Sequence, residues 1–406
     1  MNVEVINTGT ELLLGNVVNS HLAFFGRELF PLGLRVSRQV TVPDGDAIRH
    51  ALETSLRSAE IILVTGGLGP TTDDITREIT AELFGLELVE NADVLQAIAE
   101  RFARRGIVMT ERVKRQAQVP RGATVLPNLH GTAPGLYVKA ERNGTRHVFL
   151  LPGPPRELKP MFASFALPVL KALMPERAEF SMRSYRVVGM GESNVEAEIG
   201  ERVLAIPGLE LGYCARAGEV DVRCIGTAQM LDAAEAIILA KLGSHIASRD
   251  NRPVEQTVVE NLAAKNKTLA IAESCTGGLI AHRVTNVPGA SAVFFLGFVT
   301  YANSAKSAEL GVDIGLLKAH GAVSREVAAA MAEGALRAGG TDFALSTTGV
   351  AGPGGGSAEK PVGTVFIGIA ARSGETKVTQ HFFPTDRENF KQLASQAALD
   401  LLRRAL

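Results

Sequence analysis

The sequence predicts an α/β protein in which two three-layer α/β/α domains flank a small α+β middle domain. In residues 1–170 and again in 251–406, short apolar runs of strand length alternate with segments of helical spacing, which is the pattern of a sheet covered by helices. Residues 171–250 instead combine half-exposed strands with two helical segments. The length of 406 residues agrees with two or three domains, because a domain has roughly 150 residues.

In the first domain, three apolar segments end in loops rich in glycine or proline. The expected strands are Asn2 to Asn7, Ile61 to Val64 and Val148 to Leu151. Helical spacing of apolar residues predicts helices from Asn19 to Phe30 and from Asp74 to Phe84. This alternation predicts a parallel sheet with helices on both faces.

The middle domain has a shorter and more mixed pattern. Met182 to Val188 alternates like a half-exposed strand, and Glu192 to Leu204 has helical spacing. Leu209 to Gly226 holds two strand-like runs joined at Ala217 and Gly218, and a helix is expected from Ala233 to Leu242. The polar segment Asp250 to Pro253 breaks helices and is the expected linker to the third domain.

The third domain returns to the α/β pattern. Its expected strands and helices are, in chain order, Thr268 to Ala272, Gly277 to Val284, Ala292 to Thr300, Ser324 to Arg337, Phe343 to Thr347, Val362 to Ala371 and Arg387 to Arg404. Ser324 is the expected N-cap of its helix, because a serine side chain accepts a hydrogen bond from an unpaired amide of the first turn.

Charge balance argues against a nucleic-acid-binding protein. The chain has 42 Lys and Arg against 43 Asp and Glu, so it lacks a basic excess, and the short basic segment Arg101 to Arg105 is interpreted as a solvated helix face. Its 3 cysteines are too few for a disulfide framework or a four-thiolate zinc site. No apolar run is long enough to span a membrane. We therefore expect a cytoplasmic protein without membrane contact.

The loop Ala272 to Gly278 connects an expected strand to an expected helix. Unpaired amides at a helix start carry partial positive charge, and a nucleophile placed there has oxyanion donors close by. Ser274 is the candidate nucleophile, and Cys275 beside it is the rival. The same residues also suit a simple helix cap followed by glycines that allow close packing. The loop alone therefore does not distinguish a catalytic role from a structural one.

A serine nucleophile needs a base, and no histidine stands at a recognisable spacing. Lys306 follows the strand that ends at Thr300, and the sites of α/β proteins lie at strand ends. Burial would favour the neutral lysine that a base requires, whereas an exposed lysine would be a solvated helix charge. The glycine-rich segment Thr347 to Gly356 either lets backbone amides approach a phosphate or is a flexible surface loop.

The segment Thr65 to Asp74 is the densest motif of the chain. Its glycines permit close approach to a nucleotide, and Asp73 and Asp74 offer hard oxygen ligands to a divalent cation shared with substrate phosphates. Asp73 has the alternative role of a helix N-cap. The loops Thr8 to Glu11 and Leu151 to Pro155 also follow strands and are expected to line the same crevice. The expected nucleotide-binding residues are Thr8, Glu11, Gly66, Gly67, Gly69, Thr71, Gly153 and Pro154.

In this order and spacing, the motifs resemble the competence/damage-inducible protein CinA family over nearly the whole chain. The matching segments are Gly9 to Leu13, Thr65 to Asp74, Leu151 to Pro155, Ala272 to Gly278, Tyr301 to Lys306 and Thr348 to Gly356. The resemblance implies a molybdenum-cofactor-biosynthesis-like domain over 1–170 with metal-dependent ADP-ribose pyrophosphatase activity. It further implies a small middle domain over 171–250 and a nicotinamide mononucleotide (NMN) deamidase domain over 251–406 that needs no cofactor.

The resemblance also implies roles for individual residues. Ser274 matches the nucleophile, Lys306 the base, and Tyr301 a tyrosine that orients the lysine or relays a proton. Asp73 and Asp74 would hold Mg²⁺ or Co²⁺ against the ADP-ribose pyrophosphate. The residues expected to bind NMN are Thr276, Gly277, Gly278, Thr348, Gly349, Gly352, Gly354 and Gly355.

The expected protein is a bifunctional hydrolase that recycles pyridine nucleotides. It would convert NMN to nicotinic acid mononucleotide and ammonia, and ADP-ribose to AMP and ribose 5-phosphate. These small nucleotides are its expected partners, and a homodimer is its expected assembly. Two alternatives stay open: an N-terminal domain that binds a nucleotide or molybdopterin without cleaving ADP-ribose, and a non-enzymatic partner in competence or the DNA-damage response.

Overall fold

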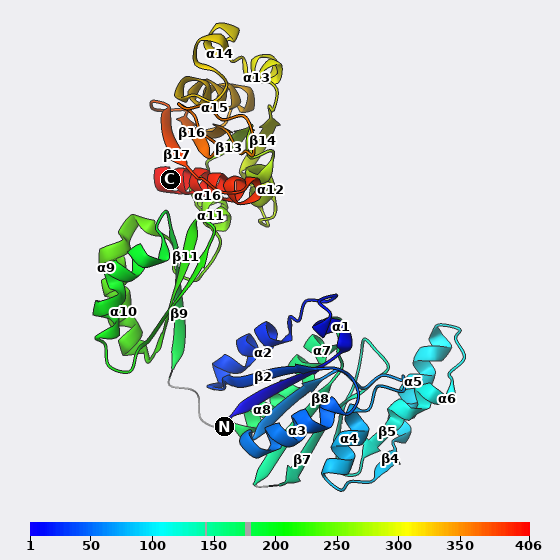
Figure 1. Ribbon diagram of the computed structural model, residues 1–406. Helices are drawn as coiled ribbons and strands as arrows, with labels where there is room; N and C mark the ends of the chain where they lie inside the picture. The colour runs from blue at the N-terminus through cyan, green and yellow to red at the C-terminus, as the bar shows by residue number, and fades with distance from the viewer. Residues whose placement is uncertain (143, 175–179) are drawn as a thin grey trace. The chain divides into compact units, whose positions relative to one another are not determined.

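The computed structural model describes residues 1–142, 144–174 and 180–406. The chain forms two compact units, Met1–Glu179 and Phe180–Leu406, each with its own sheets and apolar cores (Figure 1). The expected middle and C-terminal domains therefore share one unit. None of the helices in the described ranges combines the length and the apolar composition that crossing a bilayer requires.

The first unit is built on a six-stranded sheet with the order β2-β1-β3-β8-β7-β6. Its strands are β1 (Val3–Thr8), β2 (Val36–Val42), β3 (Ile61–Thr65), β6 (Thr124–Leu126), β7 (Gly135–Glu141) and β8 (Thr145–Leu151). β1, β2, β3 and β8 run parallel, but β7 and β6 pair antiparallel. The prediction of a wholly parallel sheet is wrong at this edge. The chain between β7 and β8 is too short for a parallel crossover, which needs roughly a dozen residues.

Helices cover both faces of this sheet, which confirms the three-layer prediction. Ile61 and Leu63 of β3 pack with α2 and α7, while Ile62 and Val64 pack with α3 and α4 on the other face. Successive side chains of a strand point to opposite faces, so this buried strand contributes to both cores. The helices are α1 (Thr10–Leu13), α2 (His21–Leu29), α3 (Ala47–Ser58), α4 (Thr76–Leu83), α7 (Pro155–Met161) and α8 (Leu167–Leu173), with a 3₁₀ turn Phe30–Leu32 and a π-helical segment Phe162–Ala166.

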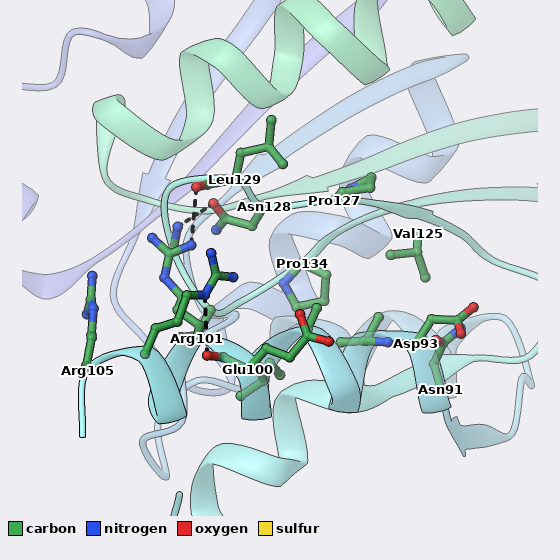
Figure 2. Close-up of a pocket in the computed structure, with 16 residues that line it drawn as sticks. Asn91, Asp93, Glu100, Arg101, Arg105, Val125, Pro127, Asn128, Leu129 and Pro134 are labelled. Carbon is green, nitrogen blue, oxygen red and sulfur yellow. Dashed lines mark hydrogen bonds between the residues drawn. The ribbon is translucent and has the colours of Figure 1, made fainter. Parts of the chain in front are cut away.

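A small substructure lies between α4 and β6 in the chain. It consists of β4 (Leu88–Glu90), α5 (Ala92–Arg104), α6 (Glu111–Lys114), a 3₁₀ turn Arg115–Ala117 and β5 (Gln118–Pro120), with β4 and β5 paired antiparallel. Val94 and Ile98 of α5 pack against Val113 and Ala117 in a core of their own. This core is small, and Val94 and Ile98 also line a cavity beside α5 (Figure 2).

The second unit begins with a four-stranded antiparallel sheet of order β10-β11-β9-β12. Its elements are β9 (Ser181–Val188), α9 (Glu192–Leu204), β10 (Glu210–Arg216), β11 (Glu219–Gly226), α10 (Ala228–Leu242), a 3₁₀ turn Gly243–His245 and β12 (Ile246–Ser248). α9 and α10 pack on one face of this sheet (Figure 1). The α+β prediction is confirmed, and the hairpin between β10 and β11 turns at Ala217 and Gly218 as expected.

The rest of the second unit is a five-stranded sheet of order β14-β13-β15-β16-β17 between two layers of helices. β13 is parallel to both of its neighbours, β14 and β15, whereas β16 is antiparallel to both of its neighbours, β15 and β17. The strands are β13 (Leu269–Glu273), β14 (Phe294–Val299), β15 (Phe343–Gly349), β16 (Thr364–Ala371) and β17 (Lys377–Phe382). The helices are α11 (Val254–Ala264), α12 (Leu279–Thr285), α13 (Asn303–Leu310), α14 (Ile314–His320), α15 (Arg325–Gly339) and α16 (Arg387–Ala405), with a 3₁₀ turn Ala290–Ala292.

The helix caps support two sequence predictions. Ser324 caps α15 by accepting a hydrogen bond from the amide of Val327 at 3.3 Å, as expected. The polar segment from Asp250 to Pro253 has no helix or strand, and α11 begins at Val254 directly after it.

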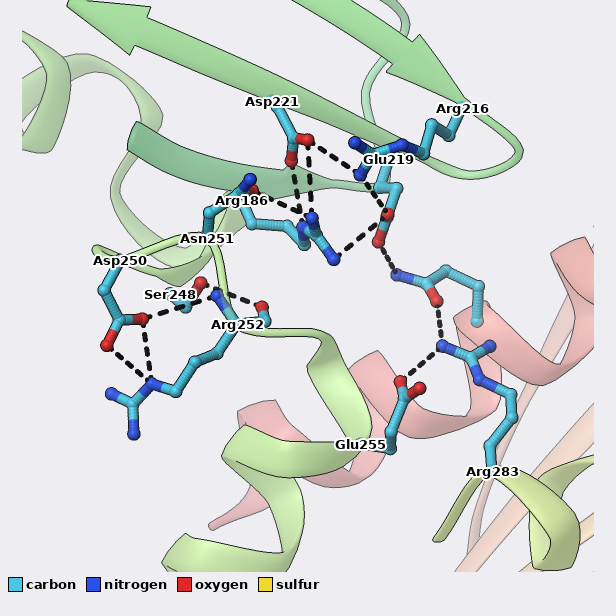
Figure 3. Close-up of polar contacts among 11 residues, drawn as sticks. Arg186, Arg216, Glu219, Asp221, Ser248, Asp250, Asn251, Arg252, Glu255 and Arg283 are labelled. Carbon is cyan, nitrogen blue, oxygen red and sulfur yellow. Dashed lines mark hydrogen bonds and ion pairs between the residues drawn. The ribbon is translucent and has the colours of Figure 1, made fainter. Parts of the chain in front are cut away.

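A polar network joins the two parts of the second unit (Figure 3). Arg186 binds Asp221 at 2.9 Å and Glu219 at 3.2 Å. Glu219 accepts a hydrogen bond from Gln396 of α16 at 3.2 Å, and Gln396 accepts one from Arg283 of α12 at 2.6 Å. Val188 of β9 also belongs to the apolar core beneath the C-terminal sheet. Both contacts explain why residues 180–406 cluster as one unit.

Candidate active sites

The first candidate site is a cavity of about 210 Å³ in the C-terminal part. It lies where β13 and β15 end, so side chains from separate loops converge there. Among the described residues, its lining comprises Ser274, Cys275, Tyr301, Asn303, Lys306, Ala322, Val323, Thr348, Gly349, Ala351 and Arg387.

Ser274 and Lys306 form a direct pair in this cavity. The Nζ of Lys306 lies 3.1 Å from the Oγ of Ser274, within hydrogen-bond distance. The same Nζ donates to the carbonyl oxygens of Thr300 at 2.8 Å and Tyr301 at 3.4 Å. These two carbonyls hold the amine at the serine. The sequence therefore predicted two groups that the structure brings into contact.

The environment of Lys306 favours its neutral form. The side chain is 1% exposed, and burial lowers the pKa of its amine, opposed by the nearby Cys275. A buried amine loses the hydration that stabilises its charge. Lys306 is thus suited to accept a proton from Ser274, which a solvated lysine near neutral pH is not.

Cys275 is a poor rival nucleophile in this structure. Its thiol is 5% exposed, and burial raises its pKa to about 12. The thiolate is the reactive form of cysteine, so Cys275 is a protonated, buried thiol near neutral pH. Its position is consistent with packing, since it belongs to the apolar core that contains Ile271 and Ile280.

Tyr301 contacts Lys306 through the backbone carbonyl of the tyrosine. Its carbonyl oxygen is the contact with the amine, while its exposed side chain accepts a hydrogen bond from Arg387 at 2.5 Å. Arg387 also donates to the carbonyl oxygen of Gly352 at 2.9 Å. Tyr301 therefore lines the cavity and orients the lysine by its carbonyl, and its hydroxyl is held by an arginine that the sequence analysis missed.

Arg387 and Asn303 are the polar lining residues that were not predicted as site residues from the sequence, and Ala322 and Val323 are apolar ones. Arg387 is the first residue of α16, behind its N-cap Asp386. A cation is unfavourable at a helix N-terminus because it opposes the helix dipole. That unfavourable placement is the one signal in the sequence that could have marked Arg387 as a residue with another role.

The cavity takes in two of the eight residues that were expected to bind NMN. Thr348 and Gly349 line it, and the Thr348 hydroxyl donates to the carbonyl of Ala322 at 2.7 Å. Thr276 is fully buried with its hydroxyl 2.7 Å from that of Thr347. Thr276 and the remaining predicted glycines are not among the residues that line the cavity; these glycines are Gly277, Gly278, Gly352, Gly354 and Gly355.

Glu273 organises the loop that carries Ser274. Its buried carboxylate accepts hydrogen bonds from the amides of Gly278 at 3.0 Å, Ile280 at 3.1 Å and Ala281 at 2.8 Å. These amides begin α12 and would otherwise be unpaired. The simple-cap interpretation is therefore partly right about this loop, but the cap is Glu273, and Ser274 faces Lys306.

The second candidate site is a crevice of about 530 Å³ in the first unit. The loops after β1, β3 and β8 meet there, as expected for strands that end at one edge of a sheet. All eight residues expected to bind a nucleotide line it, and so do Asp73 and Asp74.

The glycines of this crevice are needed where backbones approach closely. Gly66 and Gly67 have φ angles of 97° and 67°, a region that residues with a Cβ rarely adopt. A Cβ on Gly66 would collide with the Thr8 hydroxyl, and one on Gly67 with the Thr76 hydroxyl. Both glycines therefore allow this loop of the crevice to pack closely against Thr8 and Thr76.

The two acidic residues after this loop differ in their surroundings. Asp74 accepts hydrogen bonds from the amide of Thr71 at 2.9 Å and from its hydroxyl. Asp73 is exposed, and a hydrogen bond from Thr71 lowers its pKa. The expected alternative role of Asp73 as an N-cap is not found, because α4 begins after Ile75 without a side-chain cap.

The carboxylates of the crevice suit a cation that is shared with substrate. Glu11, Asp44, Asp73 and Asp74 all line it, but no three His, Cys, Asp or Glu side chains of the described chain converge as a metal cluster. Mg²⁺ is commonly held by one or two carboxylates together with substrate phosphates and water. The donor set fits that mode of binding and does not fit an all-protein cage.

Basic and unpartnered polar groups complete the crevice. Arg101, Arg105 and Arg156 line it, so two arginines of the segment interpreted as a solvated helix face also border the crevice, where Arg105 stays exposed. Gln116 and Thr8 also line the crevice, and the Oε1 of Gln116 and the Oγ1 of Thr8 are buried without a hydrogen-bond partner among the described residues.

Comparisons with known proteins agree with this organisation. Family models match residues 4–172 ("Probable molybdopterin binding domain"), 182–249 ("Damage-inducible protein CinA KH domain") and 251–406 ("CinA C-terminal domain"). A CinA-like protein of Akkermansia muciniphila is 47% identical over 400 residues, covering 98% of this chain and 96% of that protein. A CinA-like protein of Kosmotoga olearia is 39% identical over 414 residues, covering 100% and 99%.

Among solved structures, the competence/damage inducible protein CihA from Agrobacterium tumefaciens is 42% identical and covers 37% of this chain and 91% of that chain, with a TM-score of 0.36. The family itself is shown by the full-length relatives, whose alignments span all three matched segments. The chain therefore belongs to the CinA family of competence/damage-inducible proteins.

Proposed function

We propose that this protein is a bifunctional nucleotide hydrolase. Its C-terminal site deamidates NMN, and its N-terminal crevice cleaves the pyrophosphate of ADP-ribose. The observation that carries the first activity is the buried amine of Lys306 at 3.1 Å from the Ser274 hydroxyl. A serine with a neutral base in a cavity at strand ends is the machinery of covalent acyl transfer.

The reaction follows from this pair. Neutral Lys306 accepts the hydroxyl proton as Ser274 Oγ attacks the carboxamide carbon of NMN. The carbon–nitrogen bond breaks, the lysine returns the proton to the leaving nitrogen, and ammonia departs. Water then attacks the acyl ester while the lysine accepts its proton. Cleavage of the ester returns that proton to Ser274 and releases nicotinic acid mononucleotide.

The size of the cavity favours one orientation of NMN. Its 210 Å³ is smaller than the roughly 300 Å³ at which pockets begin to enclose a whole drug-sized ligand. The cavity would hold the nicotinamide end at Ser274, and the phosphate would lie toward its mouth. Arg387 lies there as an exposed cation and can bind the phosphate.

Ammonia release from NMN tests the C-terminal proposal. Ser274→Ala and Lys306→Ala should each lower turnover by at least about 100-fold, the scale of losing general base or nucleophilic catalysis. Cys275→Ala is the matched control in the same loop and should retain turnover. Normal turnover in either dyad variant would refute the dyad, and loss in Cys275→Ala alone would move the nucleophile to Cys275.

The N-terminal activity is proposed from the composition of its crevice. Close-approach glycines, three arginines and several carboxylates suit a nucleotide pyrophosphate with a divalent cation. Asp73 and Asp74 would hold the cation, which supplies charge neutralisation on the pyrophosphate when bound. Asp73 is the more accessible ligand, because it is exposed whereas Asp74 is partly buried.

Metal titration of ADP-ribose cleavage tests this second proposal. Asp73→Asn should raise the Mg²⁺ or Co²⁺ concentration for half-maximal activity by at least about tenfold, because one charged oxygen ligand is lost. Excess chelator should abolish the cleavage. Cleavage that survives chelator and the Asp73→Asn, Asp74→Asn double change would contradict the proposal.

A molybdopterin-binding role is the second candidate for the first unit. The model that matches residues 4–172 is described as a molybdopterin binding domain, and molybdopterin also combines a planar heterocycle with a phosphate. Product analysis with ADP-ribose and binding of molybdopterin separate the two. Molybdopterin binding without ADP-ribose cleavage would favour this second candidate.

A further inference from the structure

One arginine joins three helices of the C-terminal part. Arg283 of α12 donates to the carboxylate of Glu255 in α11 at 2.7 Å (Figure 3). It also donates to the Ser395 hydroxyl at 2.8 Å and to the side-chain carbonyl of Gln396 at 2.6 Å, both in α16. The Arg283 side chain is 14% exposed, so these charge-assisted bonds are largely shielded from water, which strengthens them. Arg283 therefore fixes α12 against α16.

Each of these two helices carries a part of the candidate active site at its start. α12 directly follows the loop of Ser274, and α16 begins with Arg387, which lines the cavity. Given about 3.6 residues per helical turn, Arg283 lies about one turn into α12, and its partner Ser395 lies about two turns into α16. A shift of one helix along the other at this contact would therefore change the separation of Ser274 and Arg387.

Apolar packing also holds α12 and α16 together. Ile280 and Val284 of α12 belong to the same core as Phe390 and Ala394 of α16. Burial of apolar surface is non-directional, so it favours contact without fixing how far one helix slides along the other. A planar guanidinium with donors in a fixed geometry does fix it. Arg283 adds the directional part of this helix pair.

Arg283 is in turn held from the middle part. The side-chain amide of Gln396 accepts from Arg283 through its oxygen and donates to Glu219 of β11 through its nitrogen at 3.2 Å. Glu219 is itself paired with Arg186 at 3.2 Å (Figure 3). A flipped amide would set donor against donor and acceptor against acceptor, so the two charged partners fix its orientation. The middle part thereby helps to order the helices of the C-terminal part.

We propose that Arg283 is a positioning residue of the deamidase site, which sets the separation between Ser274 and Arg387, and that Gln396 and Glu219 keep it in place. Arg283 is not one of the described residues that line the cavity, so it acts through the two helices. The inference rests on the proposed NMN deamidation and deepens it. A substrate held by its carboxamide at Ser274 and by its phosphate at Arg387 requires the correct separation, whereas a substrate without the phosphate does not.

This difference between substrates gives the test. Nicotinamide riboside has the carboxamide of NMN but lacks its phosphate, so the ratio of kcat/KM for NMN to that for nicotinamide riboside measures how well the two ends are aligned. In the full chain, Arg283→Met should lower this ratio by at least about fivefold, because a misplacement of about 1 Å can cost about 100-fold in rate. Arg387→Ala removes the phosphate contact and gives the ratio that a complete loss of alignment would reach.

Two further variants grade the effect. Gln396→Met should lower the ratio less than Arg283→Met, because Arg283 keeps its bonds to Glu255 and Ser395. Arg283→Lys keeps the charge but not the planar fork, so it should also lower the ratio, and it replaces Arg283→Met in the test if that variant does not fold.

Arg403 is a matched control at the other end of α16. Its side chain is 11% exposed, pairs with Asp400 at 2.7 Å and donates to the carbonyl of Ile246 at 3.1 Å, so it also joins α16 to the middle part. Arg403→Met should lower the thermal unfolding temperature and leave the substrate ratio unchanged. An unchanged ratio in Arg283→Met, or an equal loss in Arg403→Met, would overturn the positioning role while NMN deamidation stands. No turnover of NMN by the wild type would instead refute the proposed deamidation itself.

Discussion

At the scale of single residues, burial gives Lys306 its chemistry. A lysine in water is charged near neutral pH and cannot act as a base. Here the side chain is 1% exposed and two backbone carbonyls hold its amine at Ser274. The desolvation that lowers its pKa also costs folding free energy, so the site trades stability for a proton acceptor.

The first prediction concerns the pH dependence of NMN deamidation. Because burial lowers the pKa of Lys306 and its neutral form is the base, kcat/KM should rise with pH and level off well below pH 10.5, the usual lysine value. Lys306→Arg should lose at least about 100-fold in activity, because arginine stays protonated. The exposed Lys318 is the matched control, and Lys318→Arg should retain the profile. A flat profile from about pH 6 to pH 9 together with an active Lys306→Arg would contradict the base assignment.

The residue scale also shows what the sequence can reveal about a site. Ser274, Lys306 and the crevice glycines could be predicted because each follows a strand, and parallel strand ends meet at one edge. Arg387 and Gln116 could not, because they come from other elements whose place depends on packing. The signal for Arg387 is a cation at a helix start. The signal for Gln116 is the burial of its side-chain amide, which only the structure shows.

At the scale of elements, the start of α12 positions the nucleophile. Glu273 is the last residue of β13, and its carboxylate accepts hydrogen bonds from three backbone amides of the following turn. The cap thereby fixes the loop between strand and helix, on which Ser274 stands. A charged acceptor at a helix N-terminus is also favoured by the helix dipole.

The second prediction concerns the negative charge of the Glu273 carboxylate. Glu273→Gln should lower the free energy of unfolding by about 1–2 kcal/mol, as for loss of a helix cap, and should lower kcat for NMN more than it changes KM. Asp313 caps α14 in the same unit by accepting from Leu316, away from the cavity lining. Asp313→Ala, which removes that cap, should therefore reduce stability without changing kcat. Equal effects of the two changes on kcat would show that Glu273 only stabilises the fold.

Elements differ in how well the sequence predicts them. α9 begins and ends where helical spacing places it, and β9 and β15 lie within two residues of their expected starts or ends. The sequence did not reveal strand β7 or the antiparallel direction of β16, because strand direction is decided by connection length and not by apolar runs. The sequence does not show that Arg101 and Arg105 border a crevice, because the other residues that line it are distant in sequence.

At the scale of the whole molecule, the two units carry separate cores. Among the described residues, each core of the first unit is built from residues of that unit. In contrast, Val188 and Ala247 from the middle part pack in the core of the C-terminal part, and Gln396 bridges Glu219 and Arg283. We therefore expect two independently folding parts that meet near residue 180, and no further boundary between such parts at residue 250.

The third prediction follows from this boundary. Residues 180–406 expressed alone should fold in one transition and deamidate NMN within about twofold of the full chain, because their cores and cavity are intact. Residues 251–406 alone should unfold at lower temperature, since the surface that covered Val188 and Ala247 becomes exposed, at a cost of about 1–3 kcal/mol per side chain. Thermal unfolding and ammonia release measure both effects. If the shorter fragment were as stable as the longer one, the middle part would be a separate domain, and if the longer one were inactive, the deamidase site would require the first unit.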